Sequence, residues 1–433
     1  MIAALVTMVW GQAAPKTAGE FITRGIQFAI QGDYEKAIAD FSEAIKLEPK
    51  QSAAYALRGR AIYASVSTVT GVSENFSSIN TTSSFEKPAQ ERVRAFDRAI
   101  ADYTRAIKLD PNNSNTYRER GNVYSNKDDP NKAIADYNQA IKLDPNYARA
   151  YSNRGNAYYR KGDIARAMAD YSQAIKLDPN YAMAHNNRGL MHAYNGDFDQ
   201  AIADFSQAIR LEPNNADMYN NRATAYYDKD DFDRAITDYN QAIRLEPNFA
   251  NAYCNRGNAY YFKDDIDRAL ADYNQAIRLE PNYAYAYICR GIVYYDKDDF
   301  DRALSDYNQA IRMYPKIAYT YNLRGKAYAK KENLDKAIAD YSQAIKLDSG
   351  YINAYWNRGN AYGLKGDLNK AIADFSQAIK RDPKFFSAYA NRGYTYHLKK
   401  DYKRAIADYE AALRIDPNDD DVKALLEDAR RGR

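Results

Sequence analysis

The sequence predicts an all-α protein, a right-handed α-solenoid superhelix built from short helix-turn-helix repeats. An arginine, followed by glycine in all units but one, returns every 34 residues. Each period holds two apolar stretches with helical spacing, and no β-rich region is left over. Tyrosine supplies 41 of the 433 residues and tryptophan only two, which is typical of helices packed through aromatic rings and small residues.

The period divides the chain into eleven units over 18–419. One interval is longer, because Arg58 and Arg120 are separated by one period plus 28 residues. We therefore expect an insertion at about 65–92 in the second unit, and units that begin near 18, 52, 114, 148, 182, 216, 250, 284, 318, 352 and 386.

Within a unit the elements follow from spacing and punctuation. In 148–181 the apolar residues of each half recur at i, i+4 and i+7, which predicts two amphipathic helices. Gly162 permits a turn with positive φ, Asp163 is a good N-cap, and Pro179 ends the second helix. In the third unit Pro130 falls at a first helical position, where proline is tolerated. A stripe of Val422, Leu425, Leu426 and Ala429 predicts a capping helix over 420–433.

The positional pattern carries a family resemblance. Counted from the start of a unit, an aromatic residue falls at position four, Gly at eight, Ala at twenty, Tyr or Phe at twenty-four, Ala at twenty-seven and Pro at thirty-two. This resembles the tetratricopeptide repeat over about nine-tenths of the chain. The resemblance implies a superhelical scaffold that binds other proteins. One departure is systematic: position seven, where the family usually has Leu, is Arg in every unit.

That arginine has a candidate partner. Position twenty-three is Asp in all eleven units, and both positions fall near the seam between the two helices. A charge on a packed stripe is tolerated when it is paired, and the guanidinium fork matches a carboxylate. We expect structural ion pairs such as Arg154 with Asp170, Arg222 with Asp238 and Arg256 with Asp272; the alternative is that these charges bind a ligand.

The resemblance also places a groove on the first helix of each unit, at positions two, five, six, nine, twelve and thirteen. We call these positions the groove face. An Asn amide both donates and accepts, which suits an extended peptide backbone. A similar asparagine ladder lines the repeat domain of the enzyme that attaches N-acetylglucosamine to proteins. We predict peptide binding by Asn122, Asn153, Asn156, Asn187, Asn221, Asn255, Asn258, Asn357, Asn360, Asn391, Tyr159, Tyr227, Tyr261 and Tyr295. The alternative for the asparagines is solvated side chains without a role.

Other chemistries have little support in the sequence. A clamp for a C-terminal carboxylate would need basic residues where Met183 and Asn187 stand. His185 and His192 occupy aromatic positions without a third metal ligand, and Cys254 and Cys289 fall on neighbouring helices whose spacing disfavours a disulfide. No nucleophile-base pair or phosphate loop appears, so we expect no enzyme activity, no metal and no cofactor.

The N-terminal segment 1–17 and the insertion leave alternatives open. An apolar run from Ile2 to Trp10 resembles the end of a secretory signal, which would make the protein exported or periplasmic; otherwise a disordered or docking segment of a cytoplasmic protein fits. Asn75 and Asn80 lie in short glycosylation motifs within a Ser/Thr-rich stretch.

The predicted function is a protein-interaction scaffold that holds an extended peptide or partner segment in the groove. A nucleic-acid-binding helical-repeat protein is the alternative. It has less support because the net charge of +4 is spread over the repeats, and few groove positions are charged. We expect neither nucleic acid nor insertion of the mature chain in a membrane, and the sequence leaves the partner and the oligomeric state open.

Overall fold

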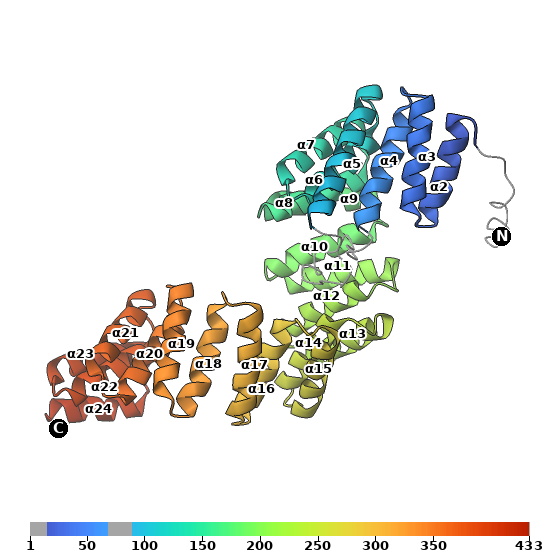
Figure 1. Cartoon of the computed structure of the whole chain (residues 1–433). Coiled ribbons are helices and arrows are strands. Elements are labelled where there is room, and N and C mark those ends of the chain that lie inside the picture. Colours follow the sequence, from blue (N-terminus) through green and yellow to red (C-terminus); the bar gives the residue numbers. More distant parts are fainter. Residues whose placement is uncertain (1–14, 68–88, 433) are drawn as a thin grey trace. The chain divides into compact units, whose positions relative to one another are not determined.

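A computed structural model describes residues 15–67 and 89–432, and in this part of the chain every regular element is a helix. The all-α repeat prediction is thereby confirmed (Figure 1). The first helices of the repeats are α2 (Ala18–Ile30), α4 (Ser52–Ser67), α6 (Ser114–Asn126), α8 (Ala148–Arg160), α10 (Ala182–Tyr194), α12 (Ala216–Tyr227), α14 (Ala250–Phe262), α16 (Ala284–Asp296), α18 (Ala318–Lys330), α20 (Ile352–Leu364) and α22 (Phe386–Leu398).

The second helices follow each first helix after a tight turn. They are α3 (Tyr34–Leu47), α5 (Ala89–Leu109), α7 (Pro130–Leu143), α9 (Ile164–Leu177), α11 (Phe198–Leu211), α13 (Phe232–Leu245), α15 (Ile266–Leu279), α17 (Phe300–Met313), α19 (Leu334–Leu347), α21 (Leu368–Arg381) and α23 (Tyr402–Ile415). The final helix, α24 (Asp420–Arg430), packs against α23 through Val422, Leu426 and Ala429 and caps the last repeat as expected.

The chain forms two compact units, Met1–Leu245 and Glu246–Arg433. Within each unit a first helix packs against its own second helix and against the second helix of the preceding repeat. First helices of successive repeats also contact each other, as α14 does with α16 and α16 with α18. Within each unit this arrangement places the first helices in one layer and the second helices in another.

The turn inside each repeat explains part of the sequence pattern. Gly162 has φ of +76°, and the Asp163 carboxylate accepts from the backbone N–H of Arg166 at 3.1 Å as the N-cap of α9. Six repeats place a residue other than glycine at the same left-handed position, among them Glu332 and Lys400. Side chains with a Cβ are strained there, so these turns give up stability that glycine would retain.

In ten of the eleven repeats the core is a tyrosine or phenylalanine ring of the second helix lying on a glycine of the first, and the sixth repeat has Ala223 at that position. A Cβ at Gly155 would stand 2.7 Å from Cε1 of Tyr171, which is closer than packed carbon atoms allow. Alanines such as Ala167 and Ala174 are fully buried beside the ring. The eighth-position glycine is thus a hole that an aromatic ring fills.

The insertion lies between the two helices of the second repeat, and both helices are longer than their counterparts in the other repeats. α4 has 16 residues and α5 has 21, whereas α8 has 13 and α9 has 14. The glycosylation motifs at Asn75 and Asn80 and the signal-like run at 2–10 lie outside the described residues. No helix in the described part of the chain has the length and apolar character needed to cross a bilayer.

Candidate functional site

A ladder of ion pairs runs through the first-helix layer. In every repeat the position-seven arginine donates from Nε and Nη2 to the two carboxylate oxygens of the position-twenty-three aspartate, over 2.6–2.8 Å. This two-point geometry fixes the orientation of both groups. In the second repeat Arg58 meets Asp102 across the insertion, so the two helices keep their register there.

The same arginine also reaches the preceding repeat. In eight repeats Nη1 donates to the side chain at position twenty-five of the repeat before, as Arg154 does to Asn138 at 2.6 Å and Arg222 to Ser206 at 3.0 Å. The Arg154 guanidinium also lies over the ring of Tyr151, with Cζ 5.3 Å from its centroid. The hydrogen bond with Asp170 raises the pKa of Arg154 above its ordinary value. The position-seven arginine therefore joins neighbouring repeats, and most of its described hydrogen bonds are made inside the array.

The sixth-position asparagines form a second ladder. Asn187 Nδ2 donates at 3.0 Å to Oδ1 of Asn156, a ninth-position residue of the preceding repeat. The Tyr171 hydroxyl donates to that same oxygen at 2.7 Å. Asn153 with Asn122 and Asn391 with Asn360 repeat the contact at 2.7 Å. The Asn156 amide oxygen thus accepts from the hydroxyl of a buried ring in its own repeat and from an amide of the next repeat.

Where the ninth position is not asparagine, the sixth-position amide finds another acceptor. Asn221 donates at 3.0 Å to the fifth-position Asn186, and Asn357 donates at 2.9 Å to Asn322. Asn255 donates to Asn251 one turn earlier in its own helix at 3.0 Å. Neither a peptide grip nor solvated side chains, the two alternatives that the sequence suggests, describes this arrangement. Except for Asn255, the partner lies 31 or 35 residues away, in the preceding repeat.

Burial separates the predicted binding asparagines into two groups. Asn153, Asn187 and Asn221 are 8%, 1% and 6% exposed, so little of each amide can meet a partner. The others are half-buried: Asn122, Asn156, Asn255, Asn258, Asn357, Asn360 and Asn391. Asn258 donates from Nδ2 to the Tyr285 hydroxyl at 3.3 Å and accepts from Tyr273 at 2.8 Å.

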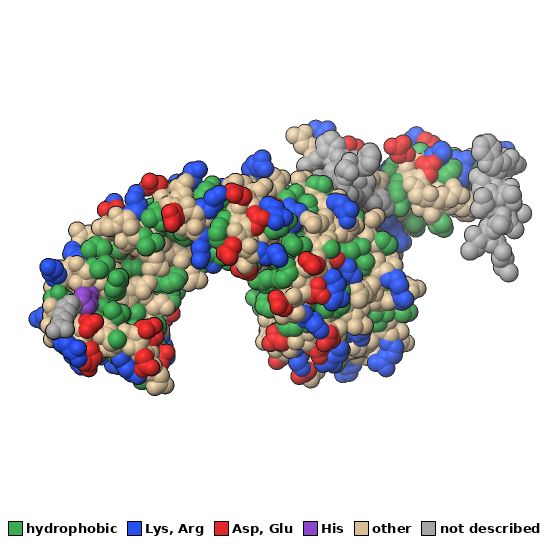
Figure 2. All heavy atoms as spheres, turned by 90° about the horizontal axis from the view of Figure 1, so that it is seen from below, with side chains coloured by type: hydrophobic (Ala, Val, Ile, Leu, Met, Phe, Trp, Pro, Cys, Tyr) green, Lys and Arg blue, Asp and Glu red, His purple; other side chains and the backbone are tan. Residues whose placement is uncertain are grey.

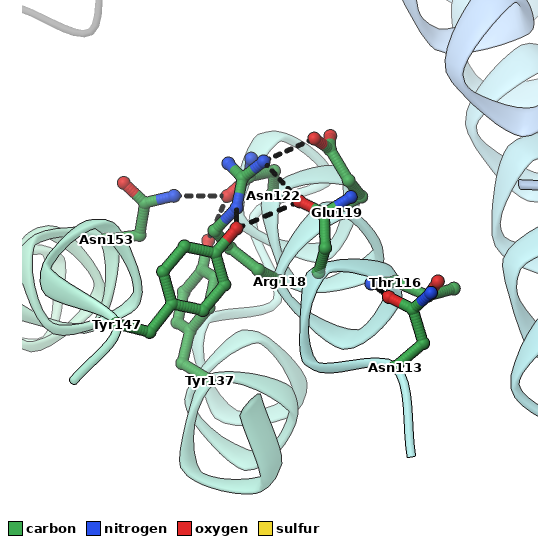
Figure 3. A network of polar contacts seen from close by, with 9 residues as sticks. Asn113, Thr116, Arg118, Glu119, Asn122, Tyr137, Tyr147 and Asn153 are labelled. Carbon is green, nitrogen blue, oxygen red and sulfur yellow. Dashed lines mark hydrogen bonds and ion pairs between the residues drawn. The ribbon is translucent and has the colours of Figure 1, made fainter. Parts of the chain in front are cut away.

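Arg118 is the centre of a network of polar contacts on the groove face (Figure 3). Its Nε donates to the Tyr147 hydroxyl at 2.6 Å, and its Nη2 contacts both Asn115 and Glu119. The Asn122 amide lies beside it (Figure 3). Arg118 therefore contacts groups of its own array.

The four predicted tyrosines are half-buried and lie on the groove face. The Tyr261 hydroxyl donates to Asp296 of the next repeat, and burial together with this bond raises the pKa of Tyr261 to about 12. The Tyr295 ring packs edge-on against Phe300, and Lys326 Nζ lies 4.9 Å from its centroid. Tyr227 packs edge-on against Phe232, and Tyr159 lies in the core cluster of Tyr171.

The histidines and cysteines lie in packed surroundings. His185 Nδ1 lies 3.4 Å from Asp204 Oδ1, and its Nε2 lies 3.1 Å from the Pro179 carbonyl oxygen. Cys254 and Cys289 are free and buried. The described residues contain no group of three or more His, Cys, Asp or Glu side chains placed to hold a metal ion.

Comparisons with known proteins match this arrangement. Family models described as TPR repeat match residues 95–128, 129–162, 155–196, 189–230, 223–264 and 325–366. Models described as Tetratricopeptide repeat match residues 24–67, 250–283, 284–317 and 357–420. The search of curated proteins gives no match.

Solved structures of similar fold include the Cut9–Hcn1 hetero-tetramer of the APC/C, at 14% identity and a TM-score of 0.50 over 96% of this chain and 97% of that chain. Yeast Tom70 has 15% identity and a TM-score of 0.45 over 96% of this chain and 95% of that chain. YrrB, described as a TPR protein with an unusual peptide-binding site, has 25% identity and a TM-score of 0.38, and covers 45% of this chain and 97% of that chain.

Proposed function

Since this chain belongs to the tetratricopeptide repeat family of protein-interaction scaffolds, we propose that it holds an extended segment of a partner protein along its groove face. The partner's backbone meets asparagine amides and tyrosine hydroxyls, and its apolar side chains meet exposed rings and aliphatic groups between them. Such a site suits a scaffold because each repeat adds one more set of contacts along the same direction.

The observation that carries the proposal is where the apolar surface lies. Of the fourteen large apolar side chains that stand exposed in the described residues, nine occupy groove-face positions two, nine or thirteen. The nine are Ile26, Ile30, Tyr194, Phe262, Tyr285, Tyr319, Leu364, Tyr394 and Leu398. Exposed apolar groups gathered on one face mark interaction surfaces. In the view of Figure 2, charged side chains of both signs are interspersed among hydrophobic ones, without a large patch of one sign.

Burial assigns the asparagines different parts in this proposal. The three nearly buried amides, Asn153, Asn187 and Asn221, hold the spacing between repeats, whereas a partner can reach the half-buried ones. Direct contacts with the partner therefore come from residues such as Asn156, Asn258 and the half-buried tyrosines.

The test is selection of peptides from a random library on the purified full chain. Phe262 and Leu364 are 60% and 76% exposed, so replacing both with Ser leaves the core intact. Selected peptides should lose roughly tenfold or more in affinity for this double variant, because burying such a side chain contributes about 1.5–3 kcal/mol. Leu47, 51% exposed and away from the groove face, provides the matched control Leu47→Ser, which should bind normally.

Equal binding of the selected peptides to wild type and to the double variant would place their site elsewhere and refute the proposal. A gel-shift titration with single-stranded RNA at low and high salt tests the other class of partner. Binding that falls steeply with salt would favour the nucleic-acid alternative.

A further inference from the structure

The groove face of repeats seven to nine carries a patch of tyrosines and their hydrogen-bond partners. We define the tyrosine patch as Tyr261 and Asn258 on α14, Tyr285 and Asp296 on α16, and Tyr319 on α18. Tyr285 and Tyr319 are 48% and 46% exposed and occupy the same position, two, in successive repeats. We propose that the tyrosine patch binds an uncharged proline-rich segment in the polyproline II conformation; this inference rests on the function proposed above.

The patch is continuous across three first helices. Asn258 of α14 donates to the hydroxyl of Tyr285 on α16, and Tyr261 of α14 donates to Asp296 of α16. α16 in turn contacts α18, which carries Tyr319. An occupant can therefore pass from one tyrosine to the next without leaving the patch.

The repeat spacing suits a polyproline II helix. The first helices α14, α16 and α18 contact one another in sequence, and helices in contact generally lie about 8–10 Å apart. A polyproline II helix has three residues per turn and rises about 3.1 Å per residue, so the same side of the peptide returns about every 9 Å. A β-strand presents the same side about every 6.6 Å, which is shorter than the spacing of the helices that carry Tyr285 and Tyr319.

The hydrogen-bonding groups of the patch also favour proline. Part of its acceptor capacity is engaged within the array, because Asn258 Oδ1 accepts from Tyr273 and Asp296 Oδ2 accepts from Tyr261. Burial raises the pKa values of Tyr285 and Tyr319 above the ordinary value, so both hydroxyls stay protonated, and the Tyr319 hydroxyl can donate to an occupant. Proline residues bring carbonyl acceptors and no N–H donors, which matches a surface with donors to offer.

The small number of charged side chains on the groove face also favours an uncharged segment. Over repeats seven to eleven the groove-face positions hold only Asp296, Lys326 and Lys330 as charged residues. Asp296 accepts from Tyr261, and Lys326 lies over the Tyr295 ring. A charged segment would find few partners here, whereas pyrrolidine rings can pack on the exposed aromatic faces.

The experiment is fluorescence polarisation of a labelled decaproline peptide titrated with the full chain. Tyr285→Ala and Tyr319→Ala should each weaken binding roughly three- to tenfold, which corresponds to the 0.5–1.5 kcal/mol of an aromatic contact. The Phe variants keep the ring and should lose less. Tyr314 is 46% exposed, like Tyr319, but lies just after α17 and off the groove face, so Tyr314→Ala is the matched control and should bind as wild type. Binding should change little between low and high salt, because no charges are paired.

A second peptide of equal length, alternating Ser and Leu, separates this inference from the proposed function. If the Ser-Leu peptide binds and loses affinity in the tyrosine variants while decaproline does not bind, the polyproline inference is wrong and the groove function stands. Decaproline binding that all variants retain would place its site outside the tyrosine patch and overturn the inference. Circular dichroism of each variant shows that a lost signal is not lost folding.

Discussion

The pair of Arg222 and Asp238 offers the sharpest test of the ion-pair ladder. The Asp238 side chain is 8% exposed and that of Arg222 is 20% exposed. Arg222→Ala leaves the carboxylate buried without its two charged hydrogen bonds, which should lower the free energy of unfolding by about 3–5 kcal/mol. Asp238→Ala should cost less, because the remaining guanidinium keeps its bond to Ser206 and is partly in contact with water.

The double variant removes both charges together. Its loss should be smaller than the sum of the single losses by about 0.5–3 kcal/mol, the range found for groups in one network. Urea unfolding followed by circular dichroism measures all three. Arg234 is the control, because its side chain is 62% exposed and pairs with Asp231 across one helical turn; Arg234→Ala should change stability by no more than about 1 kcal/mol. Additive losses for Arg222 and Asp238 would refute the pairing as a source of stability.

The other predictions use the same unfolding assay. Gly155→Ala should lower the free energy of unfolding by about 1–3 kcal/mol, because the new Cβ forces the Tyr171 ring to move. Gly363→Ala is the control: no heavy atom lies within 4 Å of its new Cβ, so it should be neutral or stabilising. Equal effects of the two substitutions would contradict the packing of the ring on the glycine. Asn156→Ala removes the oxygen that accepts from Tyr171 and Asn187, and should lower the free energy of unfolding by about 1–3 kcal/mol for each donor left without an acceptor. An unchanged unfolding midpoint would show that water replaces the amide oxygen. Lys400→Gly should raise the free energy of unfolding by about 1 kcal/mol, because φ is +60° at this residue. A lower stability would mean that contacts of the lysine side chain outweigh the strain in the turn. Burial tends to raise the pKa of Asp204, but its arginine and histidine partners outweigh burial and lower it. Its contribution is therefore present above the ordinary carboxyl pKa and is lost as pH falls through the lower folded value; Asp204→Asn should flatten this acid limb, and an unchanged limb would contradict the assignment.

Much of this architecture could be predicted from sequence because the relevant interactions are short in range along the chain. A turn, an N-cap or the contact between a glycine and the ring sixteen residues later depends on the geometry of one helix pair. The same residue types therefore recur at these positions from repeat to repeat. The pairing of Arg154 with Asp170 belongs to the same class, since both face one seam. Repetition at a fixed period then makes a local pattern visible over the whole chain.

The contacts between repeats were decided by tertiary structure alone. The sequence shows that Asn187 and Asn156 recur, yet only the packing of α10 beside α8 and α9 brings the two amides to 3.0 Å. Exposure follows the same rule: Asn187 is 1% exposed and Tyr285 48%, although both occupy groove-face positions. Periodicity assigns a residue to a face of its helix, but the neighbouring repeat determines how much of that face remains uncovered. The sequence by itself therefore determined the repeat, its helices and its paired charges, and the packing of one repeat on the next determined which side chains a partner can reach.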